Sequence, residues 1–312
     1  MSTASQVPET YELDDDDARE TLRSTGRARL AKDAFKRFRV ADGFSHSRAL
    51  AFQIMLTMIP GLIALVGLTN VVNQEGFKDI VEKTLVGIAP GPASQILTQA
   101  FNQGSSTGTT ALLIGLAGAL VGGTTAMGQL ERGANRIYGT EQDRPTLAKY
   151  GTGFVLACSS GVLSLLAFLL FVAGSAIGEA ALSSGTSDVL ITVWNIVRWP
   201  AGLVLVIAAF ALLFKESPRR TQPSASWLAM GSAVSLILWV LFTAALTFYL
   251  TASKSFGETY GPLAGVLGIL LWALLTSLAI YLGLAFAAQL EAVRAGAPGP
   301  QTGQERDDIP KV

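Results

Sequence analysis

Residues 225–250 read ASWLAMGSAVSLILWVLFTAALTFYL, and this stretch contains no Asp, Glu, Lys or Arg. A helix needs about 20 consecutive apolar residues to cross the hydrocarbon core of a bilayer. A strand of a membrane β-barrel would instead alternate apolar and polar residues over about ten positions, whereas this stretch is apolar on all sides. The stretch therefore predicts a transmembrane helix.

Five further stretches have the same character, so the sequence predicts an all-α integral membrane protein, a bundle of six transmembrane helices within residues 46–293. The composition agrees, because 50% of the 312 residues are hydrophobic and only 15% are charged, where a soluble domain carries about a quarter. The predicted spans are residues 49–72, 110–130, 150–177, 189–214, 225–250 and 262–288.

The positively charged residues lie almost entirely on one side of these spans. The two tails and the connectors 131–149 and 215–224 hold nineteen Lys and Arg residues, whereas the connectors on the opposite side hold three. Cytoplasmic loops of membrane proteins carry the excess of Lys and Arg. The sequence therefore predicts that both termini are cytoplasmic.

The segments outside the spans are predicted from their composition. Residues 1–26, with the run Asp14-Asp15-Asp16-Asp17, and residues 294–312 have little to bury, which indicates two disordered tails. Residues 27–45 combine apolar residues at helical spacing with cations, Arg37 among them, on most of the remaining surface. This pattern predicts a basic amphipathic helix among anionic lipid headgroups. A helix that binds a partner protein or nucleic acid is the alternative, but the adjacent span favours the lipid surface. Two short amphipathic helices are expected on the outer surface between the first two spans.

Small residues inside the spans predict close helix packing. Gly118 and Gly122 lie four residues apart in the second span, and Gly174 and Gly178 do so at the end of the third. Such a face serves either packing inside the bundle or the seam of a homo-oligomer, and the sequence leaves both open.

Polar groups inside a membrane are costly and often functional. Arg198 lies about a third of the way into the fourth predicted span, between Trp194 and Trp199. The guanidinium either lines a cavity, where it serves an anionic substrate, or reaches the membrane interface beside the two tryptophans. The second interpretation gains support if the helix begins only at Pro200.

Two other polar groups are candidates for a substrate path. Gln53 and Thr57 lie one turn apart in the first span, and Pro60 frees a backbone carbonyl after them. They serve either ordinary hydrogen bonds between helices or a polar path. Gln289 and Glu291 end the sixth span, where they are either solvated or salt-bridged, or part of a polar mouth that several helices share.

The sequence contains no nucleotide-binding glycine motif and no His-Glu-x-x-His zinc motif. With one His and one Cys, a zinc site of the usual ligands is excluded. Paired carboxylates, or a nucleophile with its base, cannot be assembled at one depth. We therefore expect neither an enzyme, nor a metal, nor a cofactor.

An ordered set of motifs over about residues 30–293 resembles the YihY/BrkB family of bacterial inner-membrane proteins. The first half contributes the stretch from Ala49 to Pro60, the run from Asn135 and Arg136 to Tyr138, and Arg144-Pro145. The second half contributes Ser217-Pro218-Arg219-Arg220, Trp227, Gly231, Trp239, Tyr249, Tyr260-Gly261-Pro262 and Leu271-Trp272.

Two positions depart from the family's pattern. Thr57 stands where the family usually shows Ser. The sixth span ends on Ala287-Ala288-Gln289-Leu290-Glu291-Ala292, where relatives show a motif like Gly-Ala-Glu-Leu-Asn-Ala. The carboxylate thus moves by two residues, which puts in doubt a proton-coupling role for it.

The resemblance implies a six-span protein of the bacterial inner membrane that is linked to envelope integrity, export or lipid handling. An older label, ribonuclease BN, conflicts with the single His and the lack of a soluble domain for RNA. We therefore expect a transporter or lipid-translocating protein, and a non-catalytic assembly factor of the envelope is the alternative. The candidate functional residues are Arg198, Gln53, Thr57, Pro60, Asn135, Arg136, Arg144, Tyr260, Gln289 and Glu291.

Overall fold

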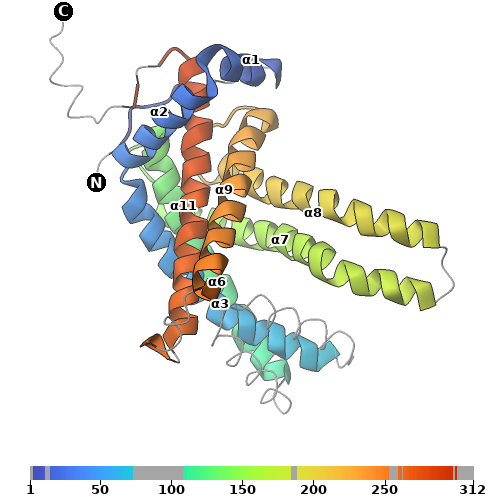
Figure 1. The fold of residues 1–312 in the computed structure, drawn as a ribbon. Coiled ribbons are helices and arrows are strands. Elements are labelled where there is room, and N and C mark those ends of the chain that lie inside the picture. The colour runs from blue at the N-terminus through green and yellow to red at the C-terminus, as the bar shows by residue number, and fades with distance from the viewer. Residues whose placement is uncertain are drawn as a thin grey trace, which may run out of the picture.

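A computed structural model describes residues 3–10, 15–72, 108–183, 188–252, 259–261, 263–297 and 299–300. These residues form helices and connecting turns, with no strand among them (Figure 1). The helices are α1 (Asp15–Thr25), α2 (Arg27–Val40), α3 (Gly43–Val72), α6 (Gly108–Tyr138), α7 (Thr146–Ser183), α8 (Asp188–Glu216), α9 (Ala225–Ala252) and α11 (Leu263–Arg294).

Six of these described helices, α3, α6, α7, α8, α9 and α11, are long and apolar enough to cross a membrane. This confirms the predicted all-α, six-span fold. Several helices extend past the predicted spans, since α6 continues to Tyr138 and α11 to Arg294. The added turns carry Glu131 and Glu291, which hydropathy excludes from a span but which are buried against protein here. The outer-surface helices predicted between the first two spans lie outside the described residues.

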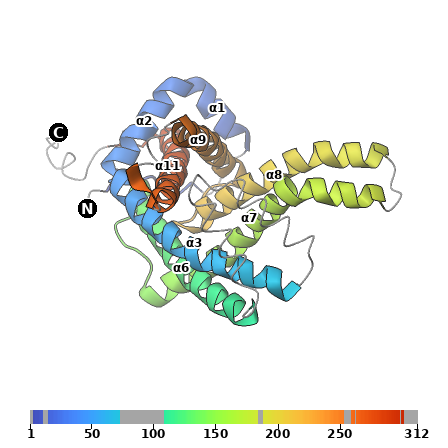
Figure 2. The same ribbon diagram turned by 60° about the horizontal axis from the view of Figure 1, so that its bottom comes forward.

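The central helix is α11, which packs on α3 and α9 and is covered at one end by α1 and α2 (Figures 1 and 2). In the most apolar stretch of α11, 39% of the residues are buried, whereas 6% are buried in the most apolar stretch of α9. Helix α9 therefore presents most of its surface to lipid, whereas α11 is largely enclosed by protein.

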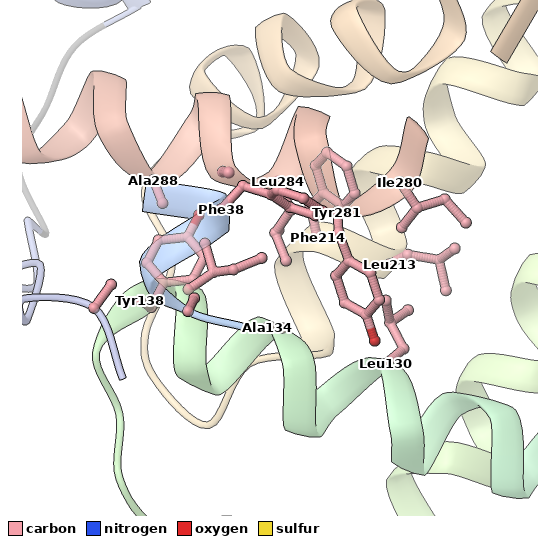
Figure 3. Close-up of a cluster of buried hydrophobic side chains, with 14 of the residues drawn as sticks. Phe38, Leu130, Ala134, Tyr138, Leu213, Phe214, Ile280, Tyr281, Leu284 and Ala288 are labelled. Atoms are coloured by element: carbon pink, nitrogen blue, oxygen red, sulfur yellow. The ribbon is translucent and has the colours of Figure 1, made fainter. Parts of the chain in front are cut away.

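The buried apolar residues gather at the end of the bundle where α11 finishes, rather than at mid-membrane depth. Figure 3 shows Phe38, Tyr138, Phe214 and Tyr281 packed together from four different helices. Aromatic rings bury a large apolar area each and so contribute strongly to this contact. This packing holds the helices together where the polar residues described below meet.

Helix α2 confirms the predicted amphipathic helix within residues 27–45, but its apolar face lies on protein. Leu30, Ala34 and Phe38 are buried, and α2 packs on α11. Phe35 and Phe44 are exposed beside the cations of α2. The part of α2 that can meet lipid is therefore this aromatic edge rather than the whole apolar face.

The N-terminal region differs from the disordered tail that the sequence predicts for residues 1–26. Residues 15–25 form α1, and Gly26 at a φ of 84° allows the turn into α2. Ala4, Val7 and Ala18 are buried. The backbone N–H of Ala4 donates to the carbonyl of Arg136 at 3.1 Å, a group that the end of α6 leaves free. Few apolar residues are enough here, because the free carbonyls of α6 supply hydrogen bonds.

Helices α3 and α6 form a tightly packed antiparallel pair through the predicted glycines. A Cβ at Gly122 would lie 2.7 Å from the hydroxyl oxygen of Thr57, and one at Gly118 would lie 2.8 Å from a ring carbon of Pro60. These glycines therefore serve packing inside the bundle, one of the two interpretations left open by the sequence.

Helices α7 and α8 pack on each other and form an arm that joins the rest of the bundle through α6 and α9. Both views show the end of the arm near Ser183 lying away from α11 (Figures 1 and 2). The indole N–H of Trp194 donates to the carbonyl of Gly174 at 2.7 Å, and Phe171 contacts Trp199. The arm is thus a helix pair with its own internal contacts.

Candidate functional site

We call the end of the bundle where α6, α8 and α11 finish and α7 and α9 begin the charged end. Five of the candidate residues lie there, because the helix ends and the short loops that follow them meet at one level. They are Asn135, Arg136, Arg144, Gln289 and Glu291. Ion pairs and hydrogen bonds join these groups across several helices, which agrees with the salt-bridged interpretation as well as with the shared polar mouth.

Arg144 ties the α6–α7 loop to the α8–α9 loop. Its backbone N–H donates to Oε1 of Glu131 at 2.8 Å, and its Nη1 lies 3.3 Å from Oε2 of the same carboxylate. The other bonds of the guanidinium go to the carbonyls of Ser217 and Pro218 at 2.8 and 3.0 Å. Because Glu131 is almost completely buried, water competes little for the oxygens of this ion pair.

Asn135 joins the same two loops through its amide. Its Nδ2 donates to Oδ1 of Asp143 at 3.0 Å, and its Oδ1 accepts from the backbone N–H of Arg219 at 2.7 Å. Asp143 also accepts from Nζ of Lys149 at 3.0 Å. Burial raises the pKa of Asp143, but the hydrogen bonds from Asn135 and Lys149 and the charge of Lys149 outweigh it and lower this pKa from 3.8 to about 2.

Arg37 of α2 is completely buried at this end, which corrects its assignment to the exposed face of that helix. Its Nε donates to Oε1 of Gln289 at 2.8 Å, and its Nη1 donates to the carbonyls of Ser5 and Ile137 at 2.9 and 3.1 Å. Among the described ion pairs none involves Arg37, so neutral oxygens satisfy this charge. Burial lowers the pKa of Arg37 to about 10.

Glu291 and Arg220 form a buried bidentate ion pair. Nη2 and Nη1 of Arg220 lie 2.8 and 2.9 Å from Oε1 and Oε2 of Glu291, and the two side chains are 3% and 1% exposed. The hydroxyl of Thr10 donates to Oε1 of Glu291 at 2.7 Å. The guanidinium of Arg220 also lies over the ring of Tyr138, 4.6 Å from its centre. The carboxylate that departs from the family pattern thus has its own partner here.

Three residues of this site were missed as site residues by the sequence analysis: Arg37, Arg220 and Thr10. Arg37 follows Leu30 and Ala34 at the spacing of the buried face, so its position could have been found. Arg220 stood only within a family motif. Thr10 gave no signal, since it lies in a segment that composition indicates to be disordered.

Arg136 lies at the charged end but outside its buried network, and Tyr260 lies elsewhere. Arg136 donates to the carbonyls of Thr140 and Glu141 after α6, which closes the end of that helix. Tyr260 is 45% exposed at the opposite end of α11, away from the charged end. Neither belongs to the buried network around Arg37 and Glu291.

The polar residues of α3 make hydrogen bonds within the α3–α6 pair. The hydroxyl of Thr57 donates to the carbonyl of Gln53 at 2.8 Å, and Oε1 of Gln53 accepts from the hydroxyl of Thr125 at 3.1 Å. Pro60 faces Gly118. These contacts agree with the interpretation that Gln53 and Thr57 make ordinary hydrogen bonds rather than line a polar path.

Arg198 lies in the arm, about ten residues after α8 begins at Asp188. The helix therefore does not begin at Pro200, and that argument for an interfacial Arg198 is wrong. The Nε and Nη1 atoms are buried, and neither has a hydrogen-bond partner in the described part of the chain. The guanidinium carbon lies 5.6 Å from the centre of the Trp199 ring, and the side chain contacts the position of Gly174. Two donors of a cation thus remain without acceptors inside an apolar helix pair.

In the described ranges no group of three or more His, Cys, Asp and Glu side chains is arranged to hold a metal ion. The described residues therefore offer two kinds of polar site, the sealed network of the charged end and the guanidinium of Arg198 within the arm. Together with the fold, they define a six-span helical membrane protein with one polar, hydrogen-bonded end.

The chain belongs to the family described as virulence factor BrkB, whose family model matches residues 34–308. This confirms the resemblance that the sequence motifs indicate. The match begins within α2 and includes all six spans.

Curated relatives are similar over most of this chain. A Bacillus subtilis (strain 168) protein that bears the name ribonuclease-like protein YfkH is 26% identical, with 81% of this chain and 91% of the relative covered. The UPF0761 membrane proteins RSc1559 of Ralstonia nicotianae and Rru_A2625 of Rhodospirillum rubrum are 24% and 27% identical, over 80% and 78% of this chain. The chain spans about half the length of these two, 55% and 54%. No solved structure matches.

Proposed function

We propose that this protein is a transporter that moves an anionic lipid or solute across the inner membrane of a bacterial cell, with both termini in the cytoplasm, and that it supports envelope integrity. The observation that carries the proposal is the guanidinium of Arg198 inside α8, two of whose buried donors have no hydrogen-bond partner among the described residues. An isolated cation in an apolar helix is costly, and such residues usually mark a substrate path.

The surroundings of Arg198 support an anionic substrate. Its two buried donors lack acceptors in the described part of the chain, which a carboxylate or phosphate would supply. The neighbouring positions Val197 and Trp199 of α8 are exposed, so a lipid can approach the arm from the side. The substrate would bring its headgroup to Arg198 while its acyl chains stay in the bilayer.

Helix α2 supports binding to anionic lipid surfaces. The exposed rings of Phe35 and Phe44 lie beside the exposed cations Lys32, Lys36 and Arg39. Aromatic residues bind at the acyl boundary while cations attract anionic headgroups. We propose no catalytic reaction, no cofactor and no nucleic-acid partner for this chain.

A non-catalytic assembly factor of the envelope is the second candidate. It is favoured by the density of hydrogen bonds and ion pairs at the charged end, which suits a rigid scaffold. A scaffold of this kind needs no substrate path, so it predicts that Arg198 is dispensable.

The experiment is lipid movement in proteoliposomes that contain fluorescent phosphatidylglycerol, with wild type compared to Arg198→Gln. Lys215→Gln is the matched control, since it removes an exposed cation from the same helix. We expect movement by wild type and Lys215→Gln, and the rate of protein-free vesicles for Arg198→Gln. Equal rates for Arg198→Gln and wild type would exclude the role of Arg198, and no movement by wild type would favour the assembly factor.

The orientation is tested separately. A reporter fused after Val312 is expected to be active only in its cytoplasmic form, as the distribution of Lys and Arg predicts. A periplasmic signal would contradict the orientation.

A further inference from the structure

Residues 3–10 lie across the charged end as an extended segment, which we call the strap. Its backbone N–H groups at Ala4 and Val7 donate to the carbonyls of Arg136 and Tyr138 at 3.1 and 3.0 Å. Gly139 follows α6 at a φ of 81°, and a Cβ there would overlap the backbone of Gln6. The strap thus packs against the end of α6 at a position where a glycine leaves room for the strap backbone.

The strap brings its polar atoms to the buried charged residues. The carbonyl of Ser5 accepts from Arg37 at 2.9 Å, and the carbonyl of Pro8 accepts from Arg220 at 3.0 Å. At its end, the Thr10 hydroxyl donates to Glu291 at 2.7 Å. The strap therefore offers two acceptors to two guanidinium groups and one hydroxyl donor to one carboxylate.

Arg37, Arg220 and Glu291 form a buried cluster beneath the strap, with more positive than negative charge. Glu291 neutralises one guanidinium, while Arg37 has only neutral acceptors among the described residues. The Nε of Arg220 is buried and has no partner in the part of the chain that the structure describes. The strap carbonyls that accept from Arg37 and Arg220 are neutral, and the carboxylate of Glu9 accepts from the backbone N–H of Thr221. These carbonyls therefore satisfy the geometry of the cluster without cancelling its charge.

A phosphate ester would satisfy both the hydrogen-bonding geometry and the excess positive charge of these residues. Arginine binds phosphate oxygens with strong, charge-assisted hydrogen bonds. A hydroxyl group on the same molecule would replace the Thr10 hydroxyl at Glu291. We infer that the cluster of Arg37, Arg220 and Glu291 binds a phosphate ester that bears a hydroxyl group. The strap occupies this site as an internal substitute.

A comparison within the charged end supports this choice. Arg144 forms an ion pair with Glu131, and its remaining bonds go to carbonyls of the loop at residues 216–218. That loop joins two spans and cannot leave. The donors of Arg37 and Arg220, by contrast, meet residues 3–10, which lie before the first span and are held by two backbone hydrogen bonds to α6.

The strap and the ligand compete for the same donors, so the ligand binds only to molecules whose strap is released. Its apparent affinity is its intrinsic affinity multiplied by the fraction of such molecules. Removing the strap is therefore expected to tighten binding. The inference concerns binding at the charged end and does not rest on transport at Arg198. A binding measurement tests it even where no lipid movement occurs.

The experiment is calorimetric titration of the detergent-solubilised protein, wild type and with residues 2–10 deleted. The probes are glycerol phosphate, dioctanoyl phosphatidylglycerol, and dioctanoyl phosphatidylcholine, which has no hydroxyl group on its headgroup. We expect the deletion to tighten binding of a hydroxyl-bearing probe by about tenfold or more, with no such gain for phosphatidylcholine. Binding of glycerol phosphate indicates a soluble ligand, and binding of phosphatidylglycerol alone indicates a lipid headgroup.

Two further variants keep the test decisive. In the full chain, Val7→Ser with Thr10→Val weakens the seat of the strap without removing it, and should tighten binding in the same direction. In the deletion background, Arg220→Gln with Glu291→Gln replaces the ion pair by neutral amides and should abolish the gain. Unchanged affinity in both the deletion and the strap variant, or a gain that survives the neutral pair, would overturn the inference.

Discussion

The two carboxylate oxygens of Glu291 each face one terminal nitrogen of Arg220, at 2.8 and 2.9 Å, in an environment where both side chains are almost inaccessible to water. This pair joins the end of α11 to the loop between α8 and α9. A buried bidentate pair of this kind positions its two elements by geometry, whatever its net contribution to the free energy of unfolding.

Replacing Glu291 by Gln is expected to destabilise the protein strongly. The change leaves the charge of Arg220 buried without a carboxylate, which costs about 3–5 kcal/mol when a buried pair loses one partner. The measurement is the unfolding free energy in detergent. The double variant Arg220→Gln with Glu291→Gln removes both charges, so it should lose much less. Equal losses in the single and the double variant would contradict the role of the ion pair.

Replacing Gln289 by Leu is expected to cost about 1–3 kcal/mol of unfolding free energy. Gln289 supplies the acceptor for Nε of the completely buried Arg37, and Leu has a similar size but no acceptor. Gln6→Leu is the matched control, because Gln6 is exposed. A loss of the same size in both variants would mean that the hydrogen bond to Arg37 is not the cause.

The hydrogen bonds at Asp143 predict a loss of stability in acid. Since the pKa of Asp143 in the folded protein is about 2, below the usual 3.8, its contribution is complete above pH 3.8. It is lost as the pH falls from 3.8 towards 2, because the unfolded chain takes up the proton first. The melting temperature of wild type should therefore fall in this window more steeply than that of Asp143→Asn. Parallel profiles of the two proteins would contradict the prediction.

The spans and the shared polar mouth could be predicted from the sequence, since both depend on local patterns. Apolar length identifies α3, α6, α7, α8, α9 and α11, and the helix-end residues Asn135, Gln289 and Glu291 indicate a polar cluster. The orientation and the role of Arg198 remain predictions.

The strap could not be predicted in the same way, and the buried Arg37 was missed although its spacing indicates it. Composition indicates disorder for residues 1–26, because only isolated small apolar residues such as Ala4 and Val7 anchor them. Their hydrogen bonds go to carbonyls freed by the end of α6, which depends on tertiary contacts. A cation count placed Arg37 on the exposed face, although its spacing from Leu30 puts it on the buried one.

The space around two glycines, one between α3 and α6 and one in α7, predicts different effects for their replacement by Ala. Gly115→Ala should destabilise the protein, because its Cβ would overlap the backbone of α3 at Ala64 and the helices would have to separate. Gly161 of α7 has open space around the position of a Cβ, so Gly161→Ala should be neutral or stabilising by up to about 1 kcal/mol through helix propensity. Unfolding of both variants in the same detergent tests this. A loss of stability at both positions would show that the glycines act through backbone flexibility rather than through the close approach of the two helices.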